Sequence, residues 1–259
     1  MDVLRINADA WDRRVAQGNP WTVPVSPEVI AAARRGAVHL LLTPSRFVPA
    51  HWYPPLEGAD VLCLASGGGQ QGPVLAAAGA RVTTVDASPA QLARDREVAQ
   101  REHLSITTLQ GDMADLHALA DDSFDLIFHP VSNCYAQAVR PVWSECARVL
   151  RSGGVLLAGF NNPVTYVFDQ QALWERGELV VAHPLPYSDL ESLPPERLEA
   201  LVAEGEALEF SHTLEDLIGG QCAAGLHLTA MLEDRWTEDV SPVLERFFPW
   251  FIATRAVKP

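Results

Sequence analysis

The chain has 259 residues, of which 48% are apolar and 20% charged, and 33 acidic side chains against 19 Lys and Arg give it a net charge of −14. This composition suits one large folded domain or two small ones, and it excludes a disordered chain, which combines high charge with low hydrophobicity. The negative balance argues against nucleic acid as a partner, because nucleic-acid binders neutralise phosphates with basic side chains.

Nothing in the sequence predicts a membrane or a metal as a partner. The longest apolar stretch, near residues 39–42, falls far short of the ~20 residues that a membrane span requires. Asp2 and Arg5 interrupt the start of the chain, where a secretory signal would need an apolar run. The cysteines lie far apart, without the spacing of a zinc site or a disulfide framework. We therefore expect a cytoplasmic protein with no metal site.

The pattern along the chain predicts strands that alternate with helices. Residues 1–57 are rich in Trp and Pro and show one helix-like run, from Pro27 to Leu42. Five apolar runs then predict strands, and amphipathic runs between them predict helices, one of which begins with a capping box at Ser88-Pro89-Ala90-Gln91. The predicted strands are 61–65, 81–85, 106–109, 124–128 and 155–160, and the predicted helices are 72–78, 89–101 and 136–150. This alternation predicts a parallel sheet with helices on both faces.

The C-terminal part predicts an insertion followed by further sheet. Residues 161–212 form an acidic insertion with a helix over 195–203 and a strand-like run over 206–212. A helix over 214–224 and strands over 226–232 and 251–257 follow. Residues 178–216 carry ten acids and one base, so most of the net charge belongs to this region. We expect a solvated outer face there, although a cationic acceptor would suit the charge equally well.

The ends of the five strands carry glycines, carboxylates and small polar side chains, and ligands bind parallel sheets at this edge. After the first strand, Gly67, Gly69 and Gly72 have GxGxxG spacing, and Asp86 ends the second strand. Glycines there allow close approach of a ligand, and a carboxylate in this position suits the hydroxyls of a ribose. The alternatives are a plain tight turn and an aspartate that only caps the next helix. A dinucleotide and S-adenosylmethionine are the two cofactors that use this arrangement.

Residues 61–160 resemble the class I, Rossmann-like S-adenosylmethionine-dependent methyltransferases of the small-molecule type. The matching pieces are VLCLASGGG (61–69), VTTVDAS (82–88), LQGDM (109–113), FDLIFH (124–129) and RVLRSGGVLLAGF (148–160). The resemblance implies a doubly wound, mostly parallel seven-stranded α/β sheet whose final strand is antiparallel. It divides the chain into an N-terminal lid segment, 1–57, and a methyltransferase domain, 58–259, with a cap-like insertion at 161–212.

The resemblance also implies a role for individual residues. The turn would hold the methionine part of the cofactor, Asp86 the ribose, and the tips of the second to fourth strands the adenine and the methionine side. The implied cofactor-binding residues are Ala65, Ser66, Gly67, Gly68, Gly69, Gln70, Asp86, Ala87, Ser88, Gly111, Asp112, Met113, His129 and Pro130. S-adenosyl-L-methionine would be the methyl donor and S-adenosyl-L-homocysteine the product.

The sequence departs from the family pattern at two positions in the turn. Cys63 stands where the family usually has an acid that helps to fix the ammonium of the cofactor, and Ala65 replaces a glycine. Gln70 and Gln71 are candidates to take over from the missing acid. The change at Ala65 is minor if that residue has ordinary strand dihedrals.

Methyl transfer is an in-line displacement, in which the protein orients the nucleophile and excludes water. His129 is the candidate catalytic base, should the acceptor need to lose a proton; the alternative is that it contacts the cofactor or a backbone carbonyl. The aromatic residues before the first strand could lie on the cofactor or anchor the segment to the core. The insertion offers acceptor-site candidates, namely Tyr166, Tyr187, His183 and His212.

The sequence thus predicts a methyltransferase that acts on a small-molecule acceptor, with no nucleic-acid or membrane partner. One alternative is an NAD-type oxidoreductase that uses the same glycine turn. The other is a non-catalytic relative that only binds.

Overall fold

The computed structural model describes residues 1–237 and 243–259, which build one seven-stranded sheet with the order β3-β2-β1-β4-β5-β7-β6. The strands are β1 (Asp60–Leu64), β2 (Arg81–Asp86), β3 (Ile106–Gln110), β4 (Phe124–His129), β5 (Leu150–Asn161), β6 (His227–Asp234) and β7 (Phe251–Val257). The first five run parallel, and β7 is antiparallel to both of its neighbours, β5 and β6. The predicted doubly wound sheet with an antiparallel final strand is confirmed.

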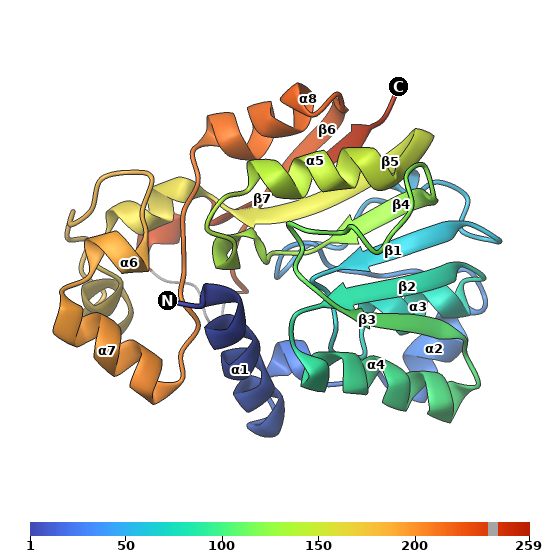
Figure 1. Cartoon of the computed structure of the whole chain (residues 1–259), viewed down its shortest axis with the longest axis horizontal. Coiled ribbons are helices and arrows are strands. Elements are labelled where there is room, and N and C mark those ends of the chain that lie inside the picture. The colour runs from blue at the N-terminus through green and yellow to red at the C-terminus, as the bar shows by residue number, and fades with distance from the viewer. Residues whose placement is uncertain (238–242) are drawn as a thin grey trace.

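Helices cover both faces of this sheet (Figure 1). They are α1 (Val3–Ala16), α2 (Pro27–Ala33), α3 (Gln71–Ala77), α4 (Pro89–Glu102), α5 (Arg140–Val149), α6 (Asp189–Ser192), α7 (Pro195–Glu204) and α8 (Gly220–Ala223). One buried cluster packs α5 against the sheet, and a second packs α2, α3 and α4 against the other face. None of the helices in the described ranges has the length and apolar character that a membrane crossing needs.

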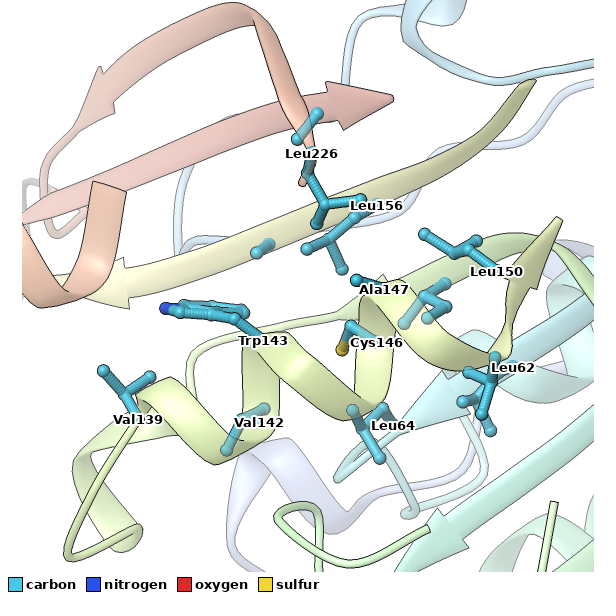
Figure 2. Packing of buried hydrophobic residues seen from close by; sticks show 14 of the residues in the cluster. Leu62, Leu64, Val139, Val142, Trp143, Cys146, Ala147, Leu150, Leu156 and Leu226 are labelled. Carbon is cyan, nitrogen blue, oxygen red and sulfur yellow. The ribbon is translucent and has the colours of Figure 1, made fainter. Parts of the chain in front are cut away.

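The apolar side of α5 shows why this helix docks on the sheet. Val142, Trp143 and Cys146 recur at helical spacing and are fully buried, in one cluster with Leu64 and Leu156 of the sheet (Figure 2). Full burial of a large apolar side chain contributes about 1.5–3 kcal/mol. The row of contacts therefore fixes α5 across the sheet, with its N-terminal end beside the loop that follows β4.

Several predicted elements differ from the structure. β5 begins at Leu150, five residues before the predicted strand, and the helix predicted over 214–224 consists of a π-helical stretch, Glu215–Gly219, followed by α8. Three other elements also differ. The helix over 27–42 ends at Ala33, because Gly36 takes a left-handed conformation (φ +87°) and the chain continues extended, with Leu40 and Leu42 buried. The helix predicted from Ala136 begins only at Arg140, since residues 133–135 form a separate turn that leaves Ala136 extended. The strand predicted over 206–212 was wrong: its one bridge joins Phe210 to Ser188.

The helix α1 was not predicted at all. Asp2 caps it by accepting a hydrogen bond from the backbone N–H of Arg5, and Val3, Asn7 and Ala10 form its buried side. In Figure 1 the parallel strands point toward α1 and toward the lobe made by the segment with α6 and α7. The carboxyl edge of the sheet thus faces α1, which was not predicted, and the segment 161–212, which was expected to be a cap.

Candidate functional site

A cavity of about 940 Å³ lies at the carboxyl ends of the parallel strands. Its walls come from α1, from the loops that follow β1 to β5, from the segment 161–212 and from the stretch before β7. Most of the predicted cofactor-binding residues line it, namely Ala65, Ser66, Gly67, Gln70, Asp86, Ala87, Ser88, Gly111, Asp112, Met113 and Pro130. Gly68, Gly69 and His129 are the predicted residues that do not. The strand ends therefore converge on one space.

The glycine turn after β1 packs closely against α4. A Cβ atom on Gly67 would lie 2.8 Å from Cβ of Gln91, so only glycine fits beside α4. Gly68 and Gly69 face away from the cavity: their N–H groups donate to the Gln91 carbonyl (3.0 Å) and to Oδ1 of Asp95 (2.6 Å). The turn thus presents backbone to the cavity on one side and is fixed to α4 on the other.

Ala65 does not have ordinary strand dihedrals. The replacement of the family glycine by alanine is therefore not the minor change that strand dihedrals would have made it. The φ of Ala65, +47°, lies in the left-handed region, where a side chain costs roughly 1–2 kcal/mol. A glycine at this position adopts the left-handed conformation without steric cost, whereas this chain adopts it with an alanine.

The carboxylate of Asp86 is held between two loops at the end of β2. It accepts hydrogen bonds from the N–H groups of Gly67 and Ser88, each 2.9 Å long. Burial raises the pKa of Asp86 to about 6, although these hydrogen bonds favour the ionised form. Asp86 is therefore an orienting group for the turn as well as a polar group of the cavity wall.

Asp95 is a second buried carboxylate at this end, and no motif indicated it. It lies on α4, is fully buried, and binds the N–H of Gly69. Burial raises the pKa of Asp95 to about 7. Cys63 packs in the core beneath the turn, where burial raises the pKa of its thiol, and it does not line the cavity. Cys63 therefore offers no charge to a cofactor ammonium.

His129 is fully buried and lies outside the cavity wall. Its Nδ1 lies 2.9 Å from the carbonyl oxygen of Leu64, and its Nε2 lies 2.9 Å from Oδ1 of Asn133. Burial lowers the pKa of His129, so the neutral ring is favoured. This geometry matches the alternative of a backbone-carbonyl contact, in which the ring ties β1 to the loop after β4. It gives no support to His129 as a base.

The N-terminal segment closes the same end of the cavity. Oδ1 of Asp12, on α1, accepts hydrogen bonds from the Ser88 hydroxyl and from the Ala90 N–H, at the start of α4. Nε2 of Gln70 donates to two carbonyls of the segment, those of Pro20 and Val23, at 3.0 Å each. The segment is thereby fixed to both the glycine turn and the loop after β2.

The aromatic residues of this segment have two different roles. Trp11 and Trp21 line the cavity, whereas Trp52 and Tyr53 pack in the core. The guanidinium of Arg14 lies 4.8 Å from the centroid of the Trp11 ring. Trp52 and Tyr53 therefore anchor the segment to the core, whereas contact of Trp11 and Trp21 with a cofactor stays a prediction.

The other half of the cavity is built by the segment 161–212. Tyr166 and Tyr187 stack with ring centroids 5.5 Å apart, and each hydroxyl donates to a carboxylate: Tyr166 to Glu209 (2.8 Å) and Tyr187 to Asp189 (2.5 Å). Asn161, at the end of β5, donates to the Tyr166 hydroxyl (2.9 Å).

Of the four acceptor-site candidates, the two tyrosines and His183 line this half of the cavity, whereas His212 does not. His212 is buried, and its Nε2 lies 3.0 Å from the backbone oxygen of Asn133. Sequence reasoning missed Asp189 and Glu209, which line the cavity, and Asp12 and Asp95, which hold the loops of its wall by hydrogen bonds. Glu209 stands out in the sequence only as a single acid between two apolar residues, Leu208 and Phe210. Nothing in the local sequence distinguishes the other three.

The comparisons with known proteins agree with this geometry. A family model described as a methyltransferase domain matches residues 62–158. The Bacillus subtilis protein named "uncharacterized methyltransferase YbaJ" is 48% identical over 252 residues, which cover 97% of each chain. The chain belongs to the class I S-adenosylmethionine-dependent methyltransferases.

Solved structures share the fold at lower identity. An S-adenosylmethionine-dependent methyltransferase from Mesorhizobium loti has a TM-score of 0.63 at 21% identity, and the match covers 80% of this chain and 94% of that one. The [4+2]-cyclase SpnF has a TM-score of 0.53 at 18% identity, over 78% of this chain and 76% of that one. Likeness at this level establishes the fold of the methyltransferase and leaves its acceptor open.

Proposed function

We propose that this methyltransferase transfers the methyl group of S-adenosylmethionine to a small molecule that binds within the cavity. The cofactor occupies the half formed by the ends of β1, β2 and β3, and the acceptor occupies the half formed by the segment 161–212. When bound, the cofactor supplies an electrophilic methyl group on a sulfonium. The observation that supports the proposal is that one cavity of about 940 Å³ is lined both by the ends of these strands and by the segment 161–212.

The residues of the first half fit the cofactor. Gly67 lines the cavity and, having no side chain, lets the turn lie close against α4, and Asp86 presents a carboxylate to a ribose. Asp112 and Met113 line the wall where an adenine would lie.

The protein contributes orientation and exclusion of water. Asp86 holds the N–H groups of Gly67 and Ser88, so the glycine turn and the loop after β2 keep a fixed distance before any ligand binds. The segment 1–57 acts as a lid, with Trp11 and Trp21 over the cavity, and the segment 161–212 acts as a cap. Such closure keeps water from the sulfonium and aligns the acceptor with it.

An acceptor larger than a small molecule does not suit this arrangement. The acceptor half is lined by α1, by the loop after β4 and by the segment 161–212, and residues 178–216 carry ten acids and one base. A small acceptor fits inside such walls, whereas a nucleic-acid strand would have to lie along an acidic lobe.

Calorimetry with S-adenosylhomocysteine and NAD tests the proposal. We expect S-adenosylhomocysteine to bind and NAD not to, and Asp86→Ala to lower the affinity roughly 10–100-fold, through loss of hydrogen bonds of about 1.5–3 kcal/mol to a charged group. Glu97→Gln, an exposed position on α4, is the matched control and should leave the affinity unchanged.

Two outcomes would overturn the assignment. An unchanged dissociation constant for S-adenosylhomocysteine in Asp86→Ala would show that this carboxylate does not bind the ribose. Absence of S-adenosylhomocysteine binding would favour a relative that works without the cofactor.

A further inference from the structure

The acceptor half of the cavity contains two carboxylates that turn inward from an otherwise exposed acidic segment. Glu191, Glu196 and Glu199 are exposed, as expected of a solvated face, whereas Asp189 is buried and Glu209 is largely buried. Both inward carboxylates line the cavity. Oδ2 of Asp189 accepts the backbone N–H of Glu209 at 2.6 Å, which keeps the two residues together.

Neither carboxylate has an ion-pair partner among the residues that the structure describes. The hydrogen bonds to their side chains come from neutral donors, the hydroxyls of Tyr166 and Tyr187 and a backbone N–H. The cations that line the cavity belong to other acids: Arg14 pairs with Glu206 (3.1 Å), and Arg197 pairs with Glu204 (3.6 Å). The chain thus leaves this end of the cavity with an excess of negative charge.

The physical consequence is a site that stabilises a positive charge. Burial raises the pKa of both Glu209 and Asp189, because the ionised carboxylates have lost water without gaining a cation. Arg14 opposes this shift at Glu209, as Arg197 and His183 do at Asp189. A ligand cation in contact with Glu209 would restore the interactions that burial removed.

The remaining walls suit a cation that carries an apolar body. The rings of Tyr166 and Tyr187 stack beside the two carboxylates, and Trp174, Trp236 and Trp250 line the same cavity. Aromatic faces attract ammonium groups and pack against hydrocarbon. Figure 1 shows the segment that supplies the tyrosines and carboxylates as a lobe beyond the ends of β4 and β5.

We propose that the acceptor is a small molecule that carries a protonated amine, with its ammonium bound by Glu209 and its apolar part against the aromatic walls. The inference rests on the proposed function, because it assigns the acceptor to this half of the cavity. An anionic acceptor would meet two carboxylates there, and a neutral one would leave their charge without compensation. The same Glu209 therefore selects for the amine and against its acidic counterpart.

Matched ligands test the inference on the protein loaded with S-adenosylhomocysteine. One set is tyramine, 4-ethylphenol and 3-(4-hydroxyphenyl)propanoate, and the other is cyclohexylamine, cyclohexanol and cyclohexanecarboxylate. In at least one set we expect the amine to bind at least tenfold more tightly than its neutral and acidic counterparts, as measured by calorimetry.

Two variants assign the preference to Glu209. Glu209→Gln should reduce the affinity for the preferred amine at least tenfold while leaving that for S-adenosylhomocysteine within twofold. Glu199→Gln, at an exposed position on α7, is the control and should change neither. The wild-type comparison within each set stands even if Glu209→Gln does not fold.

The outcomes separate this inference from the proposed function. If S-adenosylhomocysteine binds but no amine is preferred over its counterparts, the amine inference is wrong and the cofactor assignment remains. If the amine is preferred equally in Glu209→Gln, Glu209 is not the group that binds it. If S-adenosylhomocysteine itself does not bind, the proposed function fails and the inference fails with it.

Discussion

Ala65 occupies a backbone conformation that its side chain disfavours, at the point where β1 enters the glycine turn. Its φ of +47° is accessible to glycine at no steric cost. The N–H of Ala65 donates to the Val85 carbonyl at 2.7 Å, which extends the pairing of β1 and β2 into the turn. The conformation is therefore imposed by the sheet and by the turn together, and it persists despite the residue.

Ala65→Gly should consequently be close to neutral for stability. Removing the methyl group relieves roughly 1–2 kcal/mol of backbone strain, and glycine adds back about 0.5–1 kcal/mol of unfolded-state entropy. Ala93→Gly, at an exposed position inside α4, has no strain to relieve and should lose about 1 kcal/mol. Urea unfolding of both variants checks the contrast, and equal losses would show that Ala65 is not strained.

Asp95 makes the stability of the turn depend on pH. Its pKa rises from 3.8 to about 7 on folding, so the folded state binds the proton more tightly than the unfolded chain does. The stabilisation linked to that proton is fully present below about pH 4 and is lost as the pH rises through about 7. Each pKa unit corresponds to about 1.4 kcal/mol.

Asp95→Asn should remove this dependence. The free energy of unfolding of the variant, relative to that of the wild type, should increase between about pH 4 and 7 and stay constant above that, with a total gain on the order of 2–4 kcal/mol. The melting temperature of the variant should rise relative to wild type over the same range. Asp9→Asn, at an exposed position on α1, is the control for the substitution itself. Thermal unfolding across that range decides, and a flat difference for Asp95→Asn would contradict the raised pKa.

At the scale of elements, α1 links the two halves of the cavity. Its Asp12 binds the start of α4, while its Asn7 donates to the carbonyls of Tyr135 (3.2 Å) and Leu208 (3.1 Å) and accepts the N–H of Leu208 (2.7 Å). The helix thereby joins the cofactor half, the loop after β4 and the segment 161–212. A shift of α1 would change all three walls.

Asp12→Ala should accordingly weaken cofactor binding without removing a contact to the cofactor. We expect a three- to tenfold lower affinity for S-adenosylhomocysteine and a loss of about 1 kcal/mol in stability, because the start of α4 loses an acceptor for its N–H. Asp9→Ala on the same helix is the control and should change neither quantity. Calorimetry and urea unfolding measure the two effects, and an unchanged affinity would mean that α1 does not position the loop after β2.

Local sequence signals account for the elements that could be predicted. The strands of the sheet are short apolar runs whose period and end residues are visible in the chain, and the capping box at Ser88 marks the start of α4. The helix α1 shows little periodicity because its buried side includes Asn7, whose place depends on carbonyls 128 and 201 residues away. The segment 206–212 has the alternation of a strand, but it pairs with no strand of the sheet.

The same distinction holds for the site residues. Asp86 ends β2 and Asp112 comes shortly after β3, so the edge rule for parallel sheets placed both at the cavity. His129 also ends a strand, yet its ring turns inward between Leu64 and Asn133, and the strand pattern does not determine that orientation. Asp95, Asp189 and Glu209 become site residues only through the docking of distant elements.

At the scale of the whole molecule, the charge is distributed unevenly. The segment 178–216 has ten acids and one base, while the net charge of the entire chain is −14. Most of these acids are exposed, so the lobe beside the cavity presents a negative surface to any partner that approaches it. Three of them line the cavity, and two of these, Asp189 and Glu209, are without an ion-pair partner among the described residues, so one acidic segment both repels polyanions outside and favours a cation inside.

This surface predicts that the protein does not bind nucleic acid. Non-specific binders have dissociation constants of about 10⁻⁴–10⁻⁶ M at physiological salt, and that affinity comes from counterions released by basic side chains. Fluorescence anisotropy with labelled single-stranded RNA and duplex DNA at 100 mM salt should therefore show no binding up to about 100 µM protein. Replacing Glu191, Glu196, Glu199 and Glu204 with Lys would convert the lobe to a basic surface, and we expect that variant to bind both probes in a salt-dependent manner. Binding by the wild-type protein below about 10 µM would show that a basic patch elsewhere outweighs the acidic lobe, and it would reopen nucleic acid as an acceptor.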